Sequence, residues 1–114
     1  MSVKLTTRQV GDVTVVDAVG RITLGDGAST FRDTVRDLAT SGKKKLLLNL
    51  AEVSYIDSSG IGEMVSGFTT VTGQGGQMKL LNLTKRVKDL LQITKLYTVF
   101  EVFEDEAGAV RSFS

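Results

Sequence analysis

Residues 46–62 read LLLNLAEVSYIDSSGIG and contain the clearest strand and helix signals of the chain. The apolar run at residues 46–50 does not alternate with polar residues, which is typical of a strand covered on both faces of a sheet. After a connection at residues 51–57, apolar residues return at helical spacing and predict a helix that begins near residue 59. The members of this helical stripe are Ile61, Met64, Val65, Phe68 and Val71. A buried strand followed by a helix is a building unit of α/β folds.

Upstream of this unit the pattern predicts two strands. Residues 3–9 alternate apolar with polar, and residues 13–19 are rich in β-branched side chains. The Gly11-Asp12 turn between them is short, so the two strands should pair as an antiparallel hairpin. After a connection at residues 20–25, Asp26 is the expected cap of a helix that stops near Gly42. Its inner face is expected to hold Ala28, Phe31, Val35, Leu38 and Ala39.

Downstream, two more strands and two more helices are predicted. Residues 73–76, with three glycines, end the central helix, and residues 78–83 form a buried strand. Thr84 is the expected cap of the next helix, followed by a strand at residues 99–103 and a helix at 105–111. The strand at 99–103 is either an open edge or covered by the last helix. The inner faces of the two helices are expected to hold Val87, Leu90, Leu91 and Thr94, and then Ala107 and Val110.

The predicted order is β-β-α-β-α-β-α-β-α. Strands that alternate with helices imply crossover connections onto a mainly parallel sheet, and the opening hairpin makes the sheet mixed. We therefore predict a single α/β domain over residues 1–114, with its core at about residues 3–112. It should have a mixed, mainly parallel sheet of four to five strands, an N-terminal antiparallel hairpin and about four helices.

Composition excludes several classes of function. The 114 residues contain no His and no Cys, which rules out a Ser-His-Asp triad, thiol catalysis and the commonest metal ligands within the chain. The formal net charge of +1 gives no electrostatic footprint for nucleic acid. We see no signal peptide and no apolar run long enough to cross a membrane. We expect a cytoplasmic protein that is not an enzyme, has no metal and no cofactor, and does not insert into a membrane.

The candidate site is the turn Asp57-Ser58-Ser59-Gly60, where the central strand gives way to a helix. Ligands of open α/β sheets bind at the carboxyl ends of strands, and a helix start offers free N–H groups and a positive dipole end to a phosphate. The same residue types also form ordinary helix caps, so the turn alone does not decide between a site and a cap. It does not match the dinucleotide fingerprint, because Val65 stands where the third glycine is needed.

The context of the turn resembles the STAS domain family, the anti-sigma factor antagonists and their relatives. The resemblance rests on residues 46–62 and on Gly20-Arg21-Ile22, the motif at residues 76–83 and the segment at 91–96, all in the family's order. The chain departs from the family's commonest form at residues 23–27, where the nearest Asp after Gly20-Arg21-Ile22 is Asp26.

The resemblance implies a partner-switching cycle. Ser58 would be phosphorylated by a histidine-kinase-like ATPase, a serine kinase that often doubles as the anti-sigma factor, and a PP2C-type phosphatase would reset it. The unphosphorylated protein would bind the anti-sigma factor and free the sigma factor. The expected partner-binding residues are Asp57, Ser58, Ser59, Gly60, Ile61 and Gly62.

Each residue of the turn has an expected role. Asp57 should orient the turn by accepting hydrogen bonds from nearby N–H groups. Ser59 is the expected structural cap, and Gly60 and Gly62 should leave room for a partner. The alternative to a switch is a non-switching binding subunit of a lipid-transport ABC complex, because some relatives of the family serve such complexes. An enzyme or a nucleotide-binding protein is the third hypothesis.

Overall fold

The computed structural model describes residues 3–114. Met1 and Ser2 lie outside the described residues, and they begin the segment that was expected to lack a signal peptide. Within that part of the chain, five strands form one sheet in the order β1-β2-β3-β4-β5. Pairing is antiparallel between β1 and β2 and parallel elsewhere. The elements are β1 (Val3–Val10), β2 (Val13–Ile22), α1 (Asp26–Thr40), β3 (Lys45–Ile56), α2 (Ser58–Gly73), β4 (Gln77–Leu81), α3 (Lys85–Ile93), the 3₁₀ helix η1 (Leu96–Thr98), β5 (Val102–Phe103) and α4 (Glu106–Arg111).

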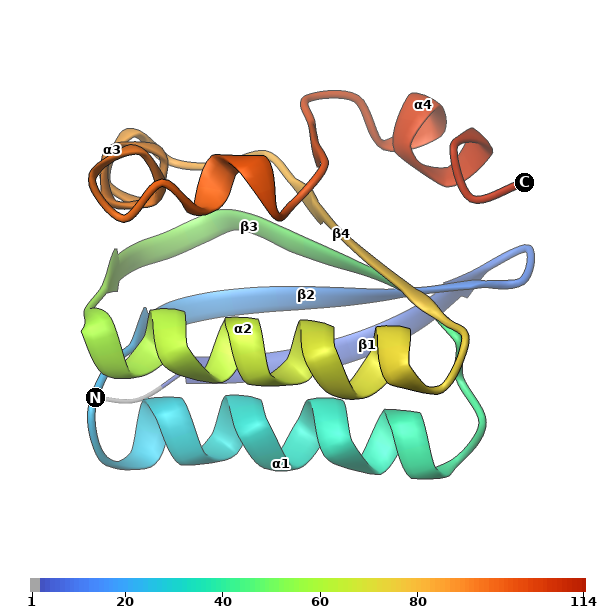
Figure 1. The fold of residues 1–114 in the computed structure, drawn as a ribbon, viewed down its shortest axis with the longest axis horizontal. Coiled ribbons are helices and arrows are strands. Elements are labelled where there is room, and N and C mark those ends of the chain that lie inside the picture. The colour runs from blue at the N-terminus through green and yellow to red at the C-terminus, as the bar shows by residue number, and fades with distance from the viewer. Residues whose placement is uncertain (1–2) are drawn as a thin grey trace.

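The sheet lies between two layers of helices. Helices α1 and α2 cover one face, and α3 and α4 lie on the other (Figure 1). Leu46 and Leu48 of β3 pack into the larger apolar cluster, and Leu47 packs into a second cluster with Ala109 and Phe113. The central strand is thus covered on both faces, as its continuous apolar run predicted. Together with the strand pairing, this confirms the predicted mixed, mainly parallel α/β sheet with an N-terminal hairpin.

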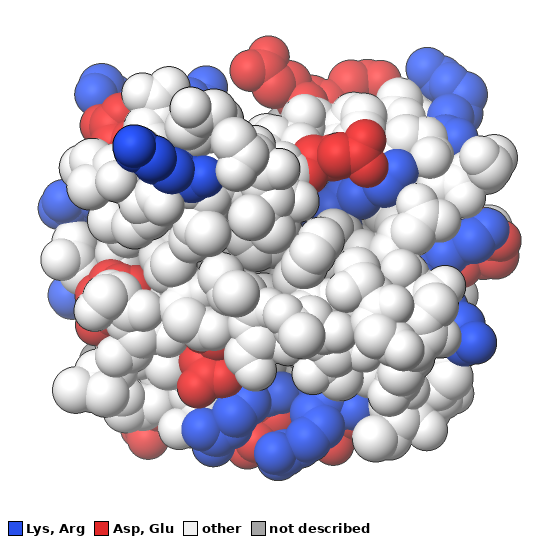
Figure 2. All heavy atoms as spheres, viewed as in Figure 1, with Lys and Arg blue, Asp and Glu red and all other residues white. Residues whose placement is uncertain are grey.

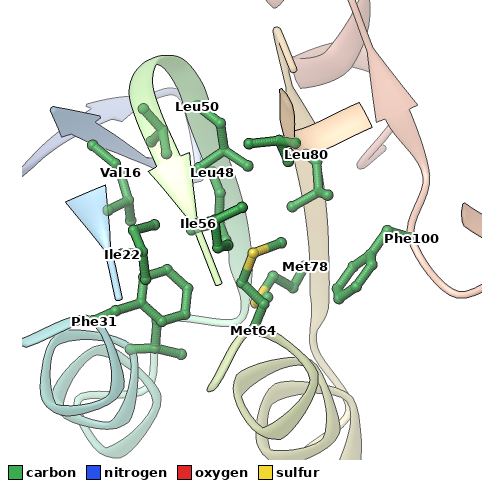
Figure 3. Close-up of a cluster of buried hydrophobic side chains, with 14 of the residues drawn as sticks. Val16, Ile22, Phe31, Leu48, Leu50, Ile56, Met64, Met78, Leu80 and Phe100 are labelled. Carbon is green, nitrogen blue, oxygen red and sulfur yellow. The ribbon is translucent and has the colours of Figure 1, made fainter. Parts of the chain in front are cut away.

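The larger core lies mainly between the sheet and the first two helices, with a smaller contribution from α3. Phe31 from α1 and Met64 from α2 point toward Ile22, Ile56 and Met78 on the strands (Figure 3). All five side chains are almost completely buried. The helical stripes predicted for α1 and α2 therefore face the sheet, as their spacing requires.

Strands β2 and β3 are longer than predicted, since residues 20–22 and 51–56 are strand rather than connection. Register shifts between Asp17 and Val19 and between Gly20 and Arg21 interrupt the regular pairing of β2 with β3. Such irregularities break the alternation of side chains that marks a strand in sequence. Beyond the shifts, Ile22 still pairs with Ile56, and both are buried.

A glycine with positive φ lies at each end of α1. Gly25, with φ 98°, occupies the N-cap position and Asp26 is the first helical residue, so the expectation that Asp26 caps the helix is wrong. At the other end, Gly42 has φ 83°, and the Gly42 and Lys43 N–H groups donate to Ala39 and Leu38 carbonyls. The predicted stop near Gly42 is confirmed.

The C-terminal third differs most from the prediction. Residues 99–101 are not strand, because the amides of Val99 and Phe100 donate to the Leu96 carbonyl and close a 3₁₀ turn. The remaining strand, β5, is the edge of the sheet, and Phe103 packs into the cluster under α4.

The predicted cap of α3 is confirmed, but not all of the predicted inner residues of α3 and α4 are. Thr84 accepts a hydrogen bond from the Val87 N–H and caps α3 as expected. Thr94 is exposed at the helix end rather than inward, because the chain leaves helical geometry there. In α4 Ala107 is exposed and not inward, Ala109 is buried, and Val110 packs against the same apolar cluster as expected.

Candidate functional site

Asp57 organises the turn between β3 and α2. It follows the last residue of β3 and occupies the N-cap position of α2, so that Ser58 is the first helical residue. Its Oδ1 accepts a hydrogen bond of 3.0 Å from the Gly60 N–H, which satisfies one of the free donors at the helix start. Asp57 thus orients the turn by accepting a hydrogen bond from a nearby N–H group, as expected. The expectation that Ser59 is the cap is wrong, because Asp57 caps α2.

The second oxygen of Asp57 reaches a different segment of the chain. Oδ2 accepts a hydrogen bond of 3.0 Å from the backbone N–H of Leu24, in the connection between β2 and α1. These N–H donors, chiefly that of Leu24 and then that of Gly60, lower the pKa of Asp57 from its ordinary value of 3.8. One ionised carboxylate therefore ties the Leu24 loop to the start of α2.

Ser58 is exposed at the first position of α2. Its position places the hydroxyl beside the N–H groups and the positive dipole end of a helix of 16 residues. A phosphate carried on this side chain would lie where backbone donors and the dipole favour a negative charge. The start of α2 would therefore accommodate the negative charge of a phosphate on Ser58.

The other expected contact residues lie at different depths. Gly62 is exposed, and a Cβ added there would meet nothing within 4 Å, whereas Ser59 is half-buried. Gly60 and Ile61 are buried. A Cβ on Gly60 would overlap the Ile22 carbonyl oxygen, so this glycine allows α2 to approach β2 and does not leave room for a partner.

A cationic stack at the same end of the sheet has no recognisable signal in the sequence. The ring of Tyr55, near the end of β3, is contacted by two guanidinium groups. That of Arg21 lies 5.4 Å from the ring centroid, and that of Arg86, from α3, lies at 4.4 Å. The three residues are brought together by strand pairing and by the packing of α3, and no local pattern predicts this.

The exposed face of α2 is unusually poor in charge. Glu63 is the only charged residue of the helix, and it lies 3.6 Å from Arg32 of α1. Figure 2 shows a broad band without charged side chains across the middle of the molecule, where α2 lies in Figure 1. Ser58 thus stands at one end of a largely uncharged surface.

Two further properties bear on the chemistry. Across residues 3–114, no group of three or more acidic side chains is placed to hold a metal ion. No helix in the same part of the chain is both long enough and apolar enough to cross a membrane.

Known proteins share this architecture. A Bacillus subtilis (strain 168) protein named anti-sigma-B factor antagonist is 32% identical over 111 residues, which cover 97% of this chain and 100% of the relative. A crystal structure from Thermotoga maritima, provisionally named an anti-sigma factor antagonist, superposes with a TM-score of 0.89 at 23% identity, over 96% of this chain and 93% of that one. The Bacillus cell fate determinant SpoIIAA in its phosphorylated form superposes with a TM-score of 0.76 at 18% identity, over 97% and 100% of the two chains.

The two structural likenesses show a common fold, which fits the sheet order and the helix layers described above. The model of the STAS domain matches residues 4–109, nearly the whole chain. This match and the full-length relative at 32% identity agree. We conclude that the chain belongs to the STAS domain family.

Proposed function

We propose that this chain is an anti-sigma factor antagonist that works by partner switching. In its unphosphorylated state it binds an anti-sigma factor of the histidine-kinase-like ATPase type, and the sigma factor is released. The same ATPase phosphorylates Ser58, the complex dissociates, and a PP2C-type phosphatase restores the hydroxyl. The observation that carries the proposal is the exposed Ser58 at the first position of α2, held there by the Asp57 cap.

Electrostatics supports phosphate as the signal that releases the partner. A phosphoserine adds about −1.5 to −2 charges near neutral pH. At Ser58 this charge would stand beside the ionised Asp57 and at the end of the uncharged surface of α2. A partner surface fitted to a neutral hydroxyl would then face repulsion and a costly burial of charge.

The same modification should leave the domain folded. The helix start stabilises a nearby negative charge by about 0.3–1 kcal/mol. Ser58 is exposed, so the phosphate needs no rearrangement of the core. Phosphorylation therefore acts on the binding surface and not on folding.

The proposed partner surface centres on Ser58 and Gly62, with the half-buried Asp57 and Ser59 at its border. Gly60 and Ile61 lie beneath it and hold its shape. The protein acts by binding and not by catalysis, and its place of action is the cytoplasm, where sigma factors work. Neither nucleic acid nor membrane is a direct partner.

Phosphorylation in vitro tests the proposal. The purified chain is incubated with ATP and with each histidine-kinase-like ATPase of its source genome, and the product is analysed by intact mass and peptide mapping. We expect one phosphate, on Ser58, and none on Ser58→Ala, with Ser59→Ala as the matched control that still accepts it. Phosphate on Ser58→Ala at the parent rate would show that Ser58 is not the acceptor. If no ATPase modifies the chain and it co-purifies instead with an ATP-binding transporter subunit, the non-switching lipid-transport role replaces the proposal.

A further inference from the structure

Leu24 is an exposed aliphatic side chain beside the candidate site. It is 79% exposed, in the connection between β2 and α1. Its backbone N–H donates to the carboxylate of Asp57, the residue that precedes Ser58. Single exposed leucines are common on protein surfaces, so the position of this one, and not its exposure alone, carries the inference.

The loop that carries Leu24 is fixed on several sides. Thr23 accepts a hydrogen bond of 2.8 Å from the Ala28 N–H, and Gly25 accepts one of 3.0 Å from the Ser29 N–H. The Leu24 N–H also donates to Asp57, so each of residues 23–25 has a backbone hydrogen bond that fixes the loop. The side chain is therefore presented at a defined place, and a partner would not have to order the loop on binding.

A partner whose footprint is centred on Ser58 would also reach Leu24. Stable protein interfaces bury about 800 Å² on each side, equivalent to a disc of roughly 16 Å radius. The Leu24 nitrogen lies 3.0 Å from Asp57, next to Ser58 in the chain, and so falls well inside such a footprint. A leucine in that position would be transferred from water into the interface.

We infer that Leu24 is an apolar anchor for the ATPase that phosphorylates Ser58, and that this partner has an apolar recess to receive it. The inference rests on the proposed function and adds a contact outside the Asp57–Gly62 turn. The neighbouring surface of α2 fits such a partner, because Glu63 is its single charged residue.

The test compares the affinity of the ATPase for variants of equal stability. The probe is the ATPase that phosphorylates Ser58 in the assay above, titrated by calorimetry with the unphosphorylated full chain. The variants are Leu24→Ala and Leu24→Asp. The matched control is Ile93→Ala, which removes the same number of carbon atoms from a side chain that is 78% exposed on α3, on the other face of the sheet from α2. Thermal melts by circular dichroism establish that all variants fold like the parent.

We expect Leu24→Ala to weaken binding by at least about tenfold and Leu24→Asp by about a hundredfold, since burial of a leucine side chain is worth that order of affinity. Ile93→Ala should stay within about twofold of the parent. If the parent binds and is phosphorylated on Ser58 while Leu24→Ala binds within about twofold, the anchor is refuted and the switch stands. If the ATPase neither binds nor phosphorylates the parent, both the switch and the anchor are refuted.

Discussion

The two hydrogen bonds of Asp57 predict a graded loss of stability when its side chain is changed. Asp57→Ala removes the acceptor for Gly60 and the acceptor for Leu24. Asp57→Asn keeps one side-chain oxygen, but its amide group cannot accept the second N–H. The alanine variant should therefore lose both links and the asparagine variant only one.

The magnitudes follow from the geometry. Loss of an N-cap side chain costs about 1 kcal/mol, and loss of a further hydrogen bond costs about 1 kcal/mol, which gives roughly 2 kcal/mol for Asp57→Ala and roughly 1 kcal/mol for Asp57→Asn. For 114 residues the unfolding entropy is roughly 0.24 kcal/mol/K, so the melting temperature should fall by about 8 °C in the first variant and about 4 °C in the second.

The pH dependence gives an independent check. The pKa of Asp57 is lowered in the folded state by the Leu24 and Gly60 N–H groups. A lowered pKa means that the carboxylate stabilises the fold fully above its unfolded pKa of 3.8, and that this contribution is lost as pH falls through the folded pKa. The stability gap between the parent and Asp57→Asn should thus be constant above about pH 5 and shrink in acid below about pH 4.

Urea unfolding followed by circular dichroism at several pH values measures both effects. Comparison with Asp57→Asn cancels the titration of the other carboxyl groups, because both proteins share them. Equal stability of all three proteins at neutral pH would refute the role of Asp57 as cap and link. A gap that widens in acid would contradict the assigned direction of the pKa shift.

Two further predictions concern packing. Gly60→Ala should destabilise the protein by at least about 3 kcal/mol in urea unfolding, because a Cβ would overlap the Ile22 carbonyl. Gly62→Ala should be neutral or stabilising by up to about 1 kcal/mol, because its Cβ would meet nothing. Equal effects of the two variants would contradict the assignment of Gly60 as buried and Gly62 as exposed. The buried Lys79 Nζ donates to the carbonyl and hydroxyl oxygens of Ser112, at the end of α4. Lys79→Met should therefore lower the free energy of unfolding by about 1–3 kcal/mol and speed hydrogen exchange in α4. Unchanged exchange in α4 would refute this anchoring role.

Much of the fold could be predicted because its signals are local. The continuous apolar run at Leu46–Leu50 indicated the central strand, and the Thr84 side chain does cap α3 as its position suggested. The lengths of β2 and β3 could not be predicted in this way. Their register shifts lie between paired strands, and the pattern of one strand does not record the irregular pairing with another.

The site was predictable in position but not in its detailed roles. The turn at residues 57–60 could be located because Asp, Ser and Gly are typical of a helix start. The assignment of the cap to Asp57 and not Ser59 depends on where α2 begins, and helix boundaries are poorly defined by sequence. The link from Leu24 to Asp57 joins residues 33 positions apart, which only the folded chain brings together.

We propose that a phosphate on Ser58 releases the partner without unfolding the domain. The direct measurement is calorimetric titration of the kinase-type ATPase with the chain before and after stoichiometric phosphorylation of Ser58, with thermal melts of both forms. We expect binding by the unmodified chain, a loss of affinity of at least about a hundredfold in the phosphorylated chain, and closely similar melting temperatures. Equal affinity of the two forms would contradict the switch, and a large fall in melting temperature would show that phosphate acts on folding instead of on the binding surface.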